Sequence, residues 1–266
     1  MSVMKLIQSI WSYRGFILGS VKRDFQFKYQ NSLLGILWII LQPLSMILVY
    51  TLIFSQVMHA KFPGSTNPLT YSIYLCSGIL AWGLFSEIST RATNTFIDNA
   101  NLLKKINFPR VCLPIIVILN AGLNFLIIFG LFTIFLLLSG NFPGISYLAV
   151  FPLLIILISF AIGVGISLGI LNVFFRDVGQ FFNIFLQFWF WLTPIVYLKS
   201  ILPDWVQTWI AYNPMEPVIA GFQQAIAGQA WPNWTALLYP LSIAAIVCTI
   251  AAILFSRHIG DMMDEL

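Results

Sequence analysis

Charged side chains are scarce in this sequence. Only 8% of its 266 residues are Asp, Glu, Lys or Arg, whereas 59% are hydrophobic and the mean hydropathy is +0.91. A soluble domain carries roughly a quarter charged residues, so this chain lacks the polar surface that water requires. The composition therefore excludes a soluble protein and predicts one membrane domain.

The residue types used by metal sites, disulfides and catalysts are also few. Cys76, Cys112 and Cys248 lie far apart, and the two histidines fall outside the apolar runs. The sequence contains no CxxC pair and no Gly-Lys-Ser/Thr phosphate loop. We predict small buried cysteines, no metal or cofactor in this chain, and no catalysis by it. Any ATP hydrolysis is left to a partner.

Long apolar runs, in contrast, are abundant. A helix needs about 20 apolar residues to cross a bilayer, and this criterion predicts an all-α membrane protein with six transmembrane helices. They lie near 33–57, 70–90, 113–138, 147–174, 178–198 and 234–256. In the fourth helix Gly165 and Gly169 are four residues apart, a spacing typical of close helix packing.

The basic residues orient these helices. All of the 13 Lys and Arg residues except Lys61 and Lys199 fall on one side of the predicted spans. The positive-inside rule places that side, with both termini, in the cytoplasm. The first apolar run is too long for a signal peptide, so we expect the N-terminus to be retained. The net charge of +4 then needs no nucleic-acid partner.

Two segments on the cytoplasmic side are predicted not to span. Residues 1–32 place Trp11, Leu18 and Phe25 at helical spacing among basic residues, which is typical of an amphipathic helix in the membrane interface. The remaining residues, 33–266, form the single six-span domain. Residues 92–108 are too polar to enter lipid and predict a short cytoplasmic helix.

A third such segment, 200–232, lies on the outer side. It contains two apolar stretches that are too short to cross, so a re-entrant or interfacial helix pair is expected. The second stretch begins with Asn213, Pro214 and Glu216 at the spacing of a capping box. Elsewhere, Glu87 and Arg91 lie four residues apart in the second span and predict a local ion pair.

Uncharged polar and aromatic residues suggest a pathway. The first span carries Trp38, Gln42 and Ser45 on one face, and the fifth carries the set Gln180, Phe182, Asn183, Gln187, Trp189, Trp191 and Tyr197 on two adjacent stripes. Amide groups at membrane depth must face protein or a watery cavity. They could form hydrogen bonds between helices. Alternatively, amides and ring faces together could line a path of many weak sites for a sugar polymer.

Five segments resemble a known family, the ABC-2-type polysaccharide export permeases, and most closely its O-antigen exporters. They are 28–38 (KYQNSLLGILW) with Gln42-Pro43, 78–85 (GILAWGLF), 101–114 (NLLKKINFPRVCLP), 172–177 (NVFFRD) and 213–215 (NPM). The resemblance implies a homodimeric permease of the bacterial inner membrane that exports undecaprenyl-diphosphate-linked O-antigen polysaccharide. Two copies of a separate ATPase would bind ATP and Mg.

The resemblance also implies residue roles. The first and fifth spans would line the channel, and an outer gate would include Trp205, Trp209, Asn213 and Glu216. Contact with the ATPase would fall within 92–108, at Thr95, Asp98, Asn99, Asn101, Lys104 and Lys105. Export of a capsule or teichoic-acid polymer is the nearest alternative. A membrane-bound polyprenyl-phosphate glycosyltransferase is another, but it would need surface carboxylates, and Asp204 and Glu216 are the only outer acids. A membrane scaffold would leave the amides unexplained.

Overall fold

The computed structural model describes residues 11–29, 37–52, 69–105, 108–258 and 260–265, and these contain helices and no strand. The α-helices are α2 (Arg14–Tyr29), α3 (Trp38–Thr51), α4 (Thr70–Asp98), α5 (Ala100–Lys105), α6 (Cys112–Leu138), α7 (Val150–Phe174), α8 (Asp177–Leu192), α9 (Asp204–Ile210), α10 (Met215–Ile226), α11 (Trp234–His258) and α12 (Asp261–Glu265). The all-α prediction is confirmed for this part of the chain.

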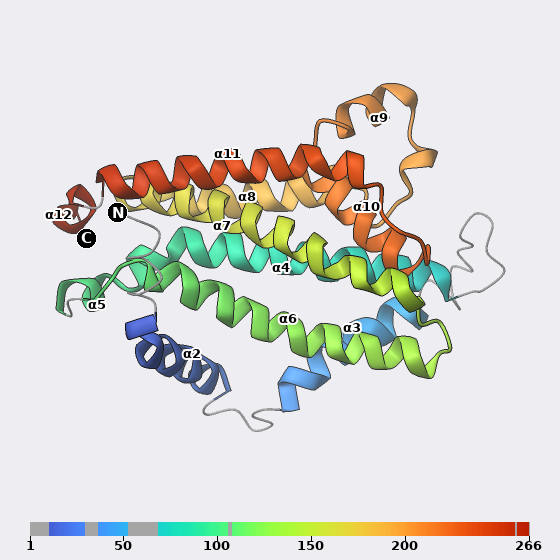
Figure 1. Cartoon of the computed structure of the whole chain (residues 1–266), viewed down its shortest axis with the longest axis horizontal. Helices are drawn as coiled ribbons and strands as arrows, with labels where there is room; N and C mark the ends of the chain where they lie inside the picture. Colours follow the sequence, from blue (N-terminus) through green and yellow to red (C-terminus); the bar gives the residue numbers. More distant parts are fainter. Residues whose placement is uncertain (1–10, 30–36, 53–68, 106–107, 259, 266) are drawn as a thin grey trace.

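Four helices are long and apolar enough to cross a membrane. They are α4, α6, α7 together with the 3-10 turn before it, and α11. These helices run side by side along the long axis of the molecule (Figure 1), and they match the second, third, fourth and sixth predicted spans. The first predicted span, 33–57, is described only as the 14-residue α3, and its two ends lie outside the described residues.

The fifth predicted span ends earlier than expected. We predicted a helix to residue 198, but α8 ends at Leu192 after 16 residues and Thr193 is extended, with ψ of 131°. The following Pro194 explains this, because a proline disfavours the helical conformation at the residue before it. At 1.5 Å per residue α8 is about 24 Å long, shorter than the hydrocarbon core of roughly 30 Å.

The second span, in contrast, is longer than predicted. Helix α4 continues without a break to Asp98, so only the six residues of α5 form a separate helix in the segment 92–108. Ala92, Thr93 and Phe96 are buried, and α4 packs along α7. Packing on this face holds the polar stretch helical where its composition alone suggested a break.

Helix α7 lies very close to both of its neighbours. A Cβ atom at Gly165 would lie 2.5 Å from the Cβ of Ala92, and one at Gly169 would lie 2.7 Å from the Ala92 carbonyl oxygen. On another face, a Cβ at Gly163 would lie 3.0 Å from the backbone nitrogen of Cys248 in α11. The prediction that these glycines serve close helix packing is confirmed.

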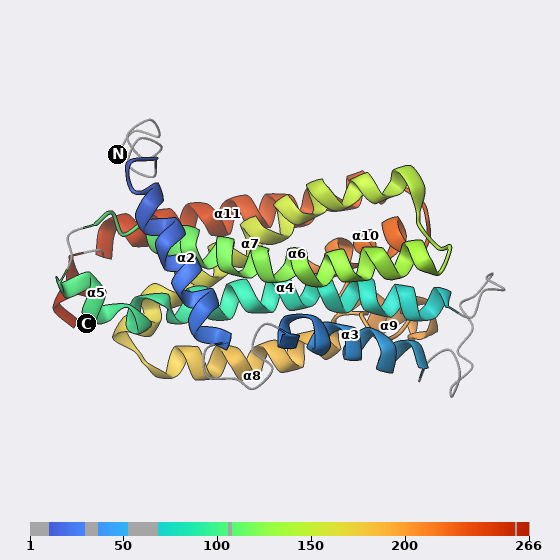
Figure 2. The same cartoon turned by 90° about the horizontal axis from the view of Figure 1, so that it is seen from below.

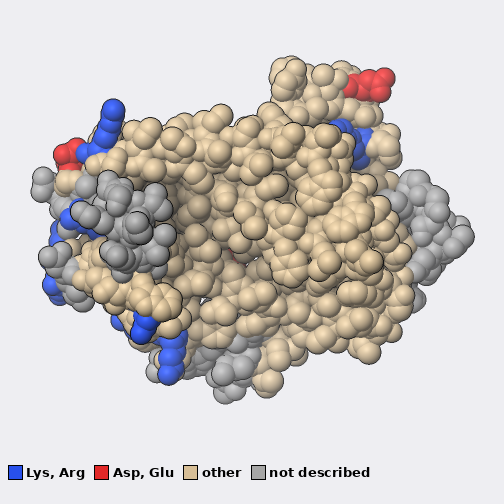
Figure 3. Space-filling view, viewed as in Figure 1, with Lys and Arg blue, Asp and Glu red and all other residues tan. Residues whose placement is uncertain are grey.

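The two ends of the bundle differ in character. Helix α2 crosses the bundle at the end that also carries α5 and α12, and the basic side chains cluster there (Figures 2 and 3). Helices α9 and α10 lie at the other end. Within α2, Ile17 and Val21 are buried, whereas Trp11 at the start of the described chain and Leu18 are exposed. That α2 lies in the membrane interface stays a prediction.

Candidate transport groove

Two rows of side chains face each other between α4 and α8. They enclose an open groove of about 540 Å³. Helix α4 contributes one residue per turn and α8 about two, because positions three and four apart share a helix face. From α4 come Trp82, Ser86 and Thr90, and from α8 come Asn183, Leu186, Gln187, Phe190 and Trp191. Three residues predicted to line a channel therefore meet here.

Most polar side chains of this groove are available to form hydrogen bonds with a ligand. Thr90 donates a long hydrogen bond of 3.4 Å to the Asn183 side-chain oxygen. Gln187 and Trp191 are exposed, and Gln187 forms no side-chain hydrogen bond with the described residues. Gln180 is also exposed on α8, but it lies outside the groove lining. The groove can thus offer hydrogen bonds and ring faces to a passing molecule.

The second aromatic stripe of α8 turns inward instead. Phe182 is buried, and Trp189 packs edge-on against Phe85 and Phe160, with ring centroids 5.2 and 6.1 Å away. Tyr197 is half-buried and donates a 2.7 Å hydrogen bond to the Trp191 carbonyl. In the single chain these three residues hold α8 and the segment after it in place, away from the groove.

The residues of the first span that were predicted to line a channel lie on the side of α4 that also carries α8. Helix α3 packs against α4 and α6, and it lies with α8 along one edge of the bundle in Figure 2. Trp38 and Ser45 are exposed, but neither belongs to the groove lining. The side chain of Gln42 lies outside the described part of the structure.

The side-chain amide of Asn213 joins α8 to α10. The Asn213 oxygen accepts hydrogen bonds from Trp189 Nε1 at 2.9 Å and from the Met215 backbone N–H at 3.0 Å, and its Nδ2 donates to Thr193 Oγ1 at 2.9 Å. The bond to Met215 confirms Asn213 as the residue that caps α10. The sequence indicated this capping bond, but gave no sign of the two bonds to α8.

The prediction that Glu216 completes the capping box is wrong. The Glu216 carboxylate accepts a 2.9 Å hydrogen bond from Lys199 Nζ, forming an ion pair. The Asn213 backbone N–H, the donor that a capping box would use, bonds the Ile210 carbonyl at 2.9 Å instead, and the bend after α8 brings Lys199 within reach of Glu216. Trp205 and Trp209 are 69% and 73% exposed on α9, which projects from the bundle (Figure 1).

The non-helical segment 193–198 is held by side chains that sequence reasoning missed. The Tyr71 hydroxyl donates to the Val196 carbonyl at 2.7 Å, and Gln223 Nε2 donates to the Ile195 carbonyl at 3.1 Å. Gly78 leaves room for the buried Gln223, since a Cβ there would lie 2.6 Å from Nε2. Irregular backbone at membrane depth needs such partners. A glutamine in the apolar run of α10 was the one available signal.

Asn172, at the end of α7, is another missed residue. Its Nδ2 donates to the Thr93 carbonyl and to Asn94 Oδ1, both at 3.2 Å, and its Oδ1 accepts from the Gly179 N–H at 2.9 Å. The amide thus fixes the start of α8 against α4. It lies in the 172–177 motif, but its burial was visible only in the fold.

The residues predicted to contact an ATPase divide into two groups. Asp98, Asn101, Lys104 and Lys105 are exposed around α5. Thr95 is only 4% exposed, and its carbonyl accepts a 2.8 Å hydrogen bond from the partly buried Asn99 side chain. The first group is available for a direct contact, whereas Thr95 could act only through its neighbours.

The predicted ion pair of α4 is confirmed. Arg91 lies 3.0 Å from Glu87, and Asn124 of α6 adds a 2.8 Å hydrogen bond to the other carboxylate oxygen. All three cysteines are free, and Cys76 and Cys112 are buried. Among the described residues no group of three or more His, Cys, Asp or Glu side chains could hold a metal ion.

Comparison with known proteins places this fold in a family. Residues 17–227 match the ABC-2 type transporter model. The O-antigen export system permease protein RfbA of Klebsiella pneumoniae is 32% identical over 76% of each chain. The RfbA of Myxococcus xanthus is 26% identical over 99% of this chain and 100% of its own length.

A third relative has a different name. The polysialic acid transport protein KpsM of Escherichia coli is 23% identical over 77% of this chain and 78% of its own length. The family match covers most of the described helices, including both helices that form the groove. The chain belongs to the ABC-2 type transporter family.

Proposed function

We propose that this chain is the membrane-spanning permease subunit of an ABC transporter that exports an undecaprenyl-diphosphate-linked O-antigen polysaccharide across the bacterial inner membrane. The groove between α4 and α8 is the observation that carries the proposal. The names of the relatives at 32% and 26% identity support O-antigen as the substrate. A capsule polymer is the second candidate, and the more distant polysialic acid transport protein favours it.

The chemistry of the groove suits a sugar chain. Sugars carry hydroxyl groups around apolar C–H faces, so they can bond with amides and pack on rings at the same site. Asn183 and Gln187 supply the amides, and Trp191 supplies an exposed ring beside the buried Trp82. Transport requires many weak sites rather than one tight site, and exposed neutral groups provide such sites.

A second copy of the chain would close the path. The groove is open on one side, and the adjacent surface of α8 is apolar, with Phe181, Ile184 and Phe188 all exposed. Most soluble and membrane oligomers of one chain type are symmetric, so a twofold partner would bring two α8 helices together. The exposed surface of α3 would lie in the same interface.

The cytoplasmic side is proposed to be the end that carries α2, α5 and α12, with both termini. There, α5 presents Asn101, Lys104 and Lys105 outward, and we expect this helix to contact one of two ATPase subunits. Cysteines at Asn101 and at facing positions of the ATPase should crosslink in membranes. If only α2 yields crosslinks, this contact is misplaced.

Filling the groove tests the function directly. In cells that depend on this chain for export, Gln187→Trp should stop the appearance of glycan at the cell surface, with lipid-linked glycan accumulating inside. Assembly with the ATPase and ATP hydrolysis should persist. Ile246→Trp, at an exposed position of α11 outside both the groove and the proposed interface, is the control and should export normally. Normal export by Gln187→Trp would contradict the proposed path.

The polymer itself distinguishes the two candidate substrates. O-antigen is expected to reach the surface joined to the lipopolysaccharide core, whereas a capsule polymer is not. Extraction of lipopolysaccharide from cells with and without the chain, followed by gel separation, therefore decides between them. Loss of the long-chain lipopolysaccharide bands supports O-antigen export, and unchanged bands with a lost capsule support the alternative.

A further inference from the structure

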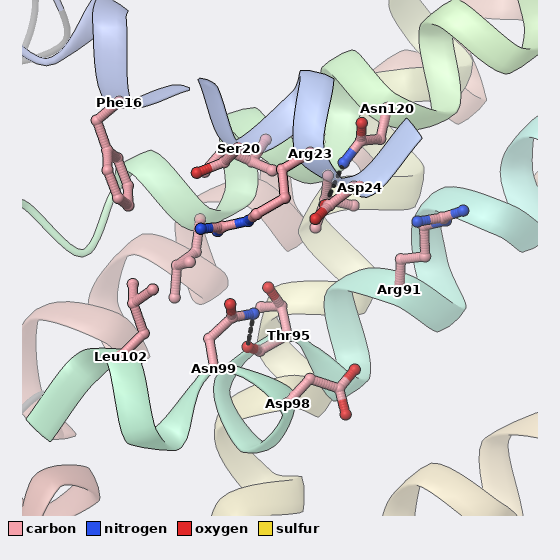
Figure 4. A pocket seen from close by; sticks show the side chains of 13 residues that line it. Phe16, Ser20, Arg23, Asp24, Arg91, Thr95, Asp98, Asn99, Leu102 and Asn120 are labelled. Atoms are coloured by element: carbon pink, nitrogen blue, oxygen red, sulfur yellow. Dashed lines mark hydrogen bonds between the residues drawn. The ribbon is translucent and has the colours of Figure 1, made fainter. Parts of the chain in front are cut away.

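A second cavity lies at the basic end, where α2 crosses the bundle. It has a volume of about 290 Å³ and is enclosed by α2, α4, α5 and α6 (Figure 4). Phe16, Leu113 and Ile116 form part of an apolar wall. The charged and amide groups that line it are Arg23, Asp24, Arg91, Asp98, Asn99 and Asn120. On α4, residues 91 and 95 point away from the groove rows, so this cavity is separate from the proposed path.

The side chains around this cavity carry charges of both signs. Asp24 accepts a 2.8 Å hydrogen bond from Asn120, and Arg91 is paired with Glu87. Arg23 and Asp98 form no ion pair with any residue in the described ranges. With Arg91 paired and Asn120 neutral, one positive group, Arg23, and two negative groups, Asp24 and Asp98, line this space without an opposite charge among the described residues. A ligand that carries both a negative and a positive group would compensate charges of both signs.

We propose that this cavity binds the headgroup of a phosphatidylethanolamine lipid. Arg23 would receive the phosphate, since a guanidinium donates hydrogen bonds to phosphate oxygens. Asp98 and Asp24 would accept from the primary ammonium group, which has three N–H donors. The apolar wall would receive the glycerol region, and the exposed Leu18 of α2 and Trp11 just before it would lie in the surrounding lipid.

The two aspartates and the single unpaired arginine disfavour other lipids at this site. A diphosphate carries at least two negative charges, and the two aspartates would repel it. Phosphatidylglycerol lacks the positive group that Asp98 requires. A phosphatidylcholine headgroup has the positive charge but no N–H donor, so it cannot form hydrogen bonds to the carboxylates. The selectivity for phosphatidylethanolamine is thus the measurable consequence of the geometry.

Native mass spectrometry of the assembled transporter tests this proposal. The complex is incubated in detergent with equal amounts of phosphatidylethanolamine, phosphatidylcholine and phosphatidylglycerol, and the retained lipids are counted. Wild-type protein should retain phosphatidylethanolamine preferentially. Arg23→Gln and Asp98→Asn should each reduce that retention about tenfold, as expected for loss of one charge-assisted hydrogen bond. Lys22→Gln on the same helix and Asp177→Asn, both outside the cavity, are the matched controls.

Three results would overturn the proposal. They are equal retention of all three lipids by the wild-type protein, unchanged retention in both cavity variants, and displacement of phosphatidylethanolamine by undecaprenyl diphosphate. The comparison of lipids on wild-type protein needs no variant to fold. The measurement is also independent of export, so it can fail while the proposed function stands.

Discussion

Helix α4 has two faces that behave in opposite ways. Toward α7 it is sealed, because Gly165 and Gly169 let the two backbones meet at Ala92 without space for a side chain. Toward α8 it diverges, and Trp82, Ser86 and Thr90 line an open groove. We name the first face the seam and the second face the groove. The contrast teaches that one helix can pack without a gap on one face and line an open groove with another.

Side-chain amides also differ between the seam and the groove. In the seam region, the Asn172 amide uses both of its ends in hydrogen bonds to α4 and α8. In the groove, Gln187 is exposed and forms no side-chain bond to the described residues. Asn172 therefore fits the interpretation as a hydrogen bond between helices, while a path lining stays a prediction for Gln187.

The largest expected effect comes from placing a side chain in the seam. Gly165→Leu should lower the free energy of unfolding by about 3 kcal/mol or more, since its side chain would overlap Ala92 and Ser89. Thermal unfolding in detergent measures this. Gly122→Leu is the control, because no atom lies within 4 Å of its Cβ position. Equal stability of the two variants would mean that the seam is not tightly packed.

A pair of amide substitutions compares the two faces directly. Asn172→Leu removes three hydrogen bonds and should lower stability by roughly 2 kcal/mol, taking the average value of about 0.6 kcal/mol per bond between membrane helices. Gln187→Leu should leave stability within about 0.5 kcal/mol, as is usual for exposed positions, while export falls. A larger loss of stability in Gln187→Leu would assign this amide to packing between subunits.

Chemical labelling tests which face of α8 meets water. Cysteines at Asn183 and Gln187 should react with a small charged thiol reagent in membranes, whereas one at Phe188, outside the groove lining, should react slowly because lipid or a second copy covers it. The natural cysteines must first be replaced by Ser or Ala. Equal labelling at all three positions would remove the distinction between the groove and the rest of α8.

The smallest expected effect concerns two neighbours on opposite faces. Ser89 is fully buried in the seam and donates a 3.4 Å hydrogen bond to the Ala161 carbonyl, while Thr90 donates across the groove. Ser89→Ala should lower stability by about 0.6 kcal/mol or less. Thr90→Val, which preserves shape, should leave stability unchanged and slow export slightly. A larger loss of stability in Thr90→Val than in Ser89→Ala would show that the two faces are misassigned.

Periodicity and composition predicted the long helices well, for a clear reason. A helix that must cross lipid needs a continuous apolar run, so α6, α7 and α11 are visible in the sequence as unbroken stretches. The capping role of Asn213 and the Glu87–Arg91 pair were also predictable, because both depend on residues close in the chain. Their geometry follows from helix spacing alone.

The sequence predicted only in part which residues of α8 face the bundle and which face outward. Spacing placed Asn183, Gln187 and Trp191 on one face, but it could not show that Phe182 and Trp189 face the bundle. That outcome depends on Phe85 and Phe160, which are distant in sequence and meet Trp189 only through the packing of α4 and α7.

The sequence by itself determined the class, the extent of α6, α7 and α11 and the uneven charge of the two ends, since each follows from transfer of local side chains between water and lipid. Only the tertiary structure decided where α4 and α8 separate, how Asn172 and Asn213 join three elements each, and which charges surround the cavity under α2. These features require groups far apart in the chain to meet, and no local pattern specifies such a meeting.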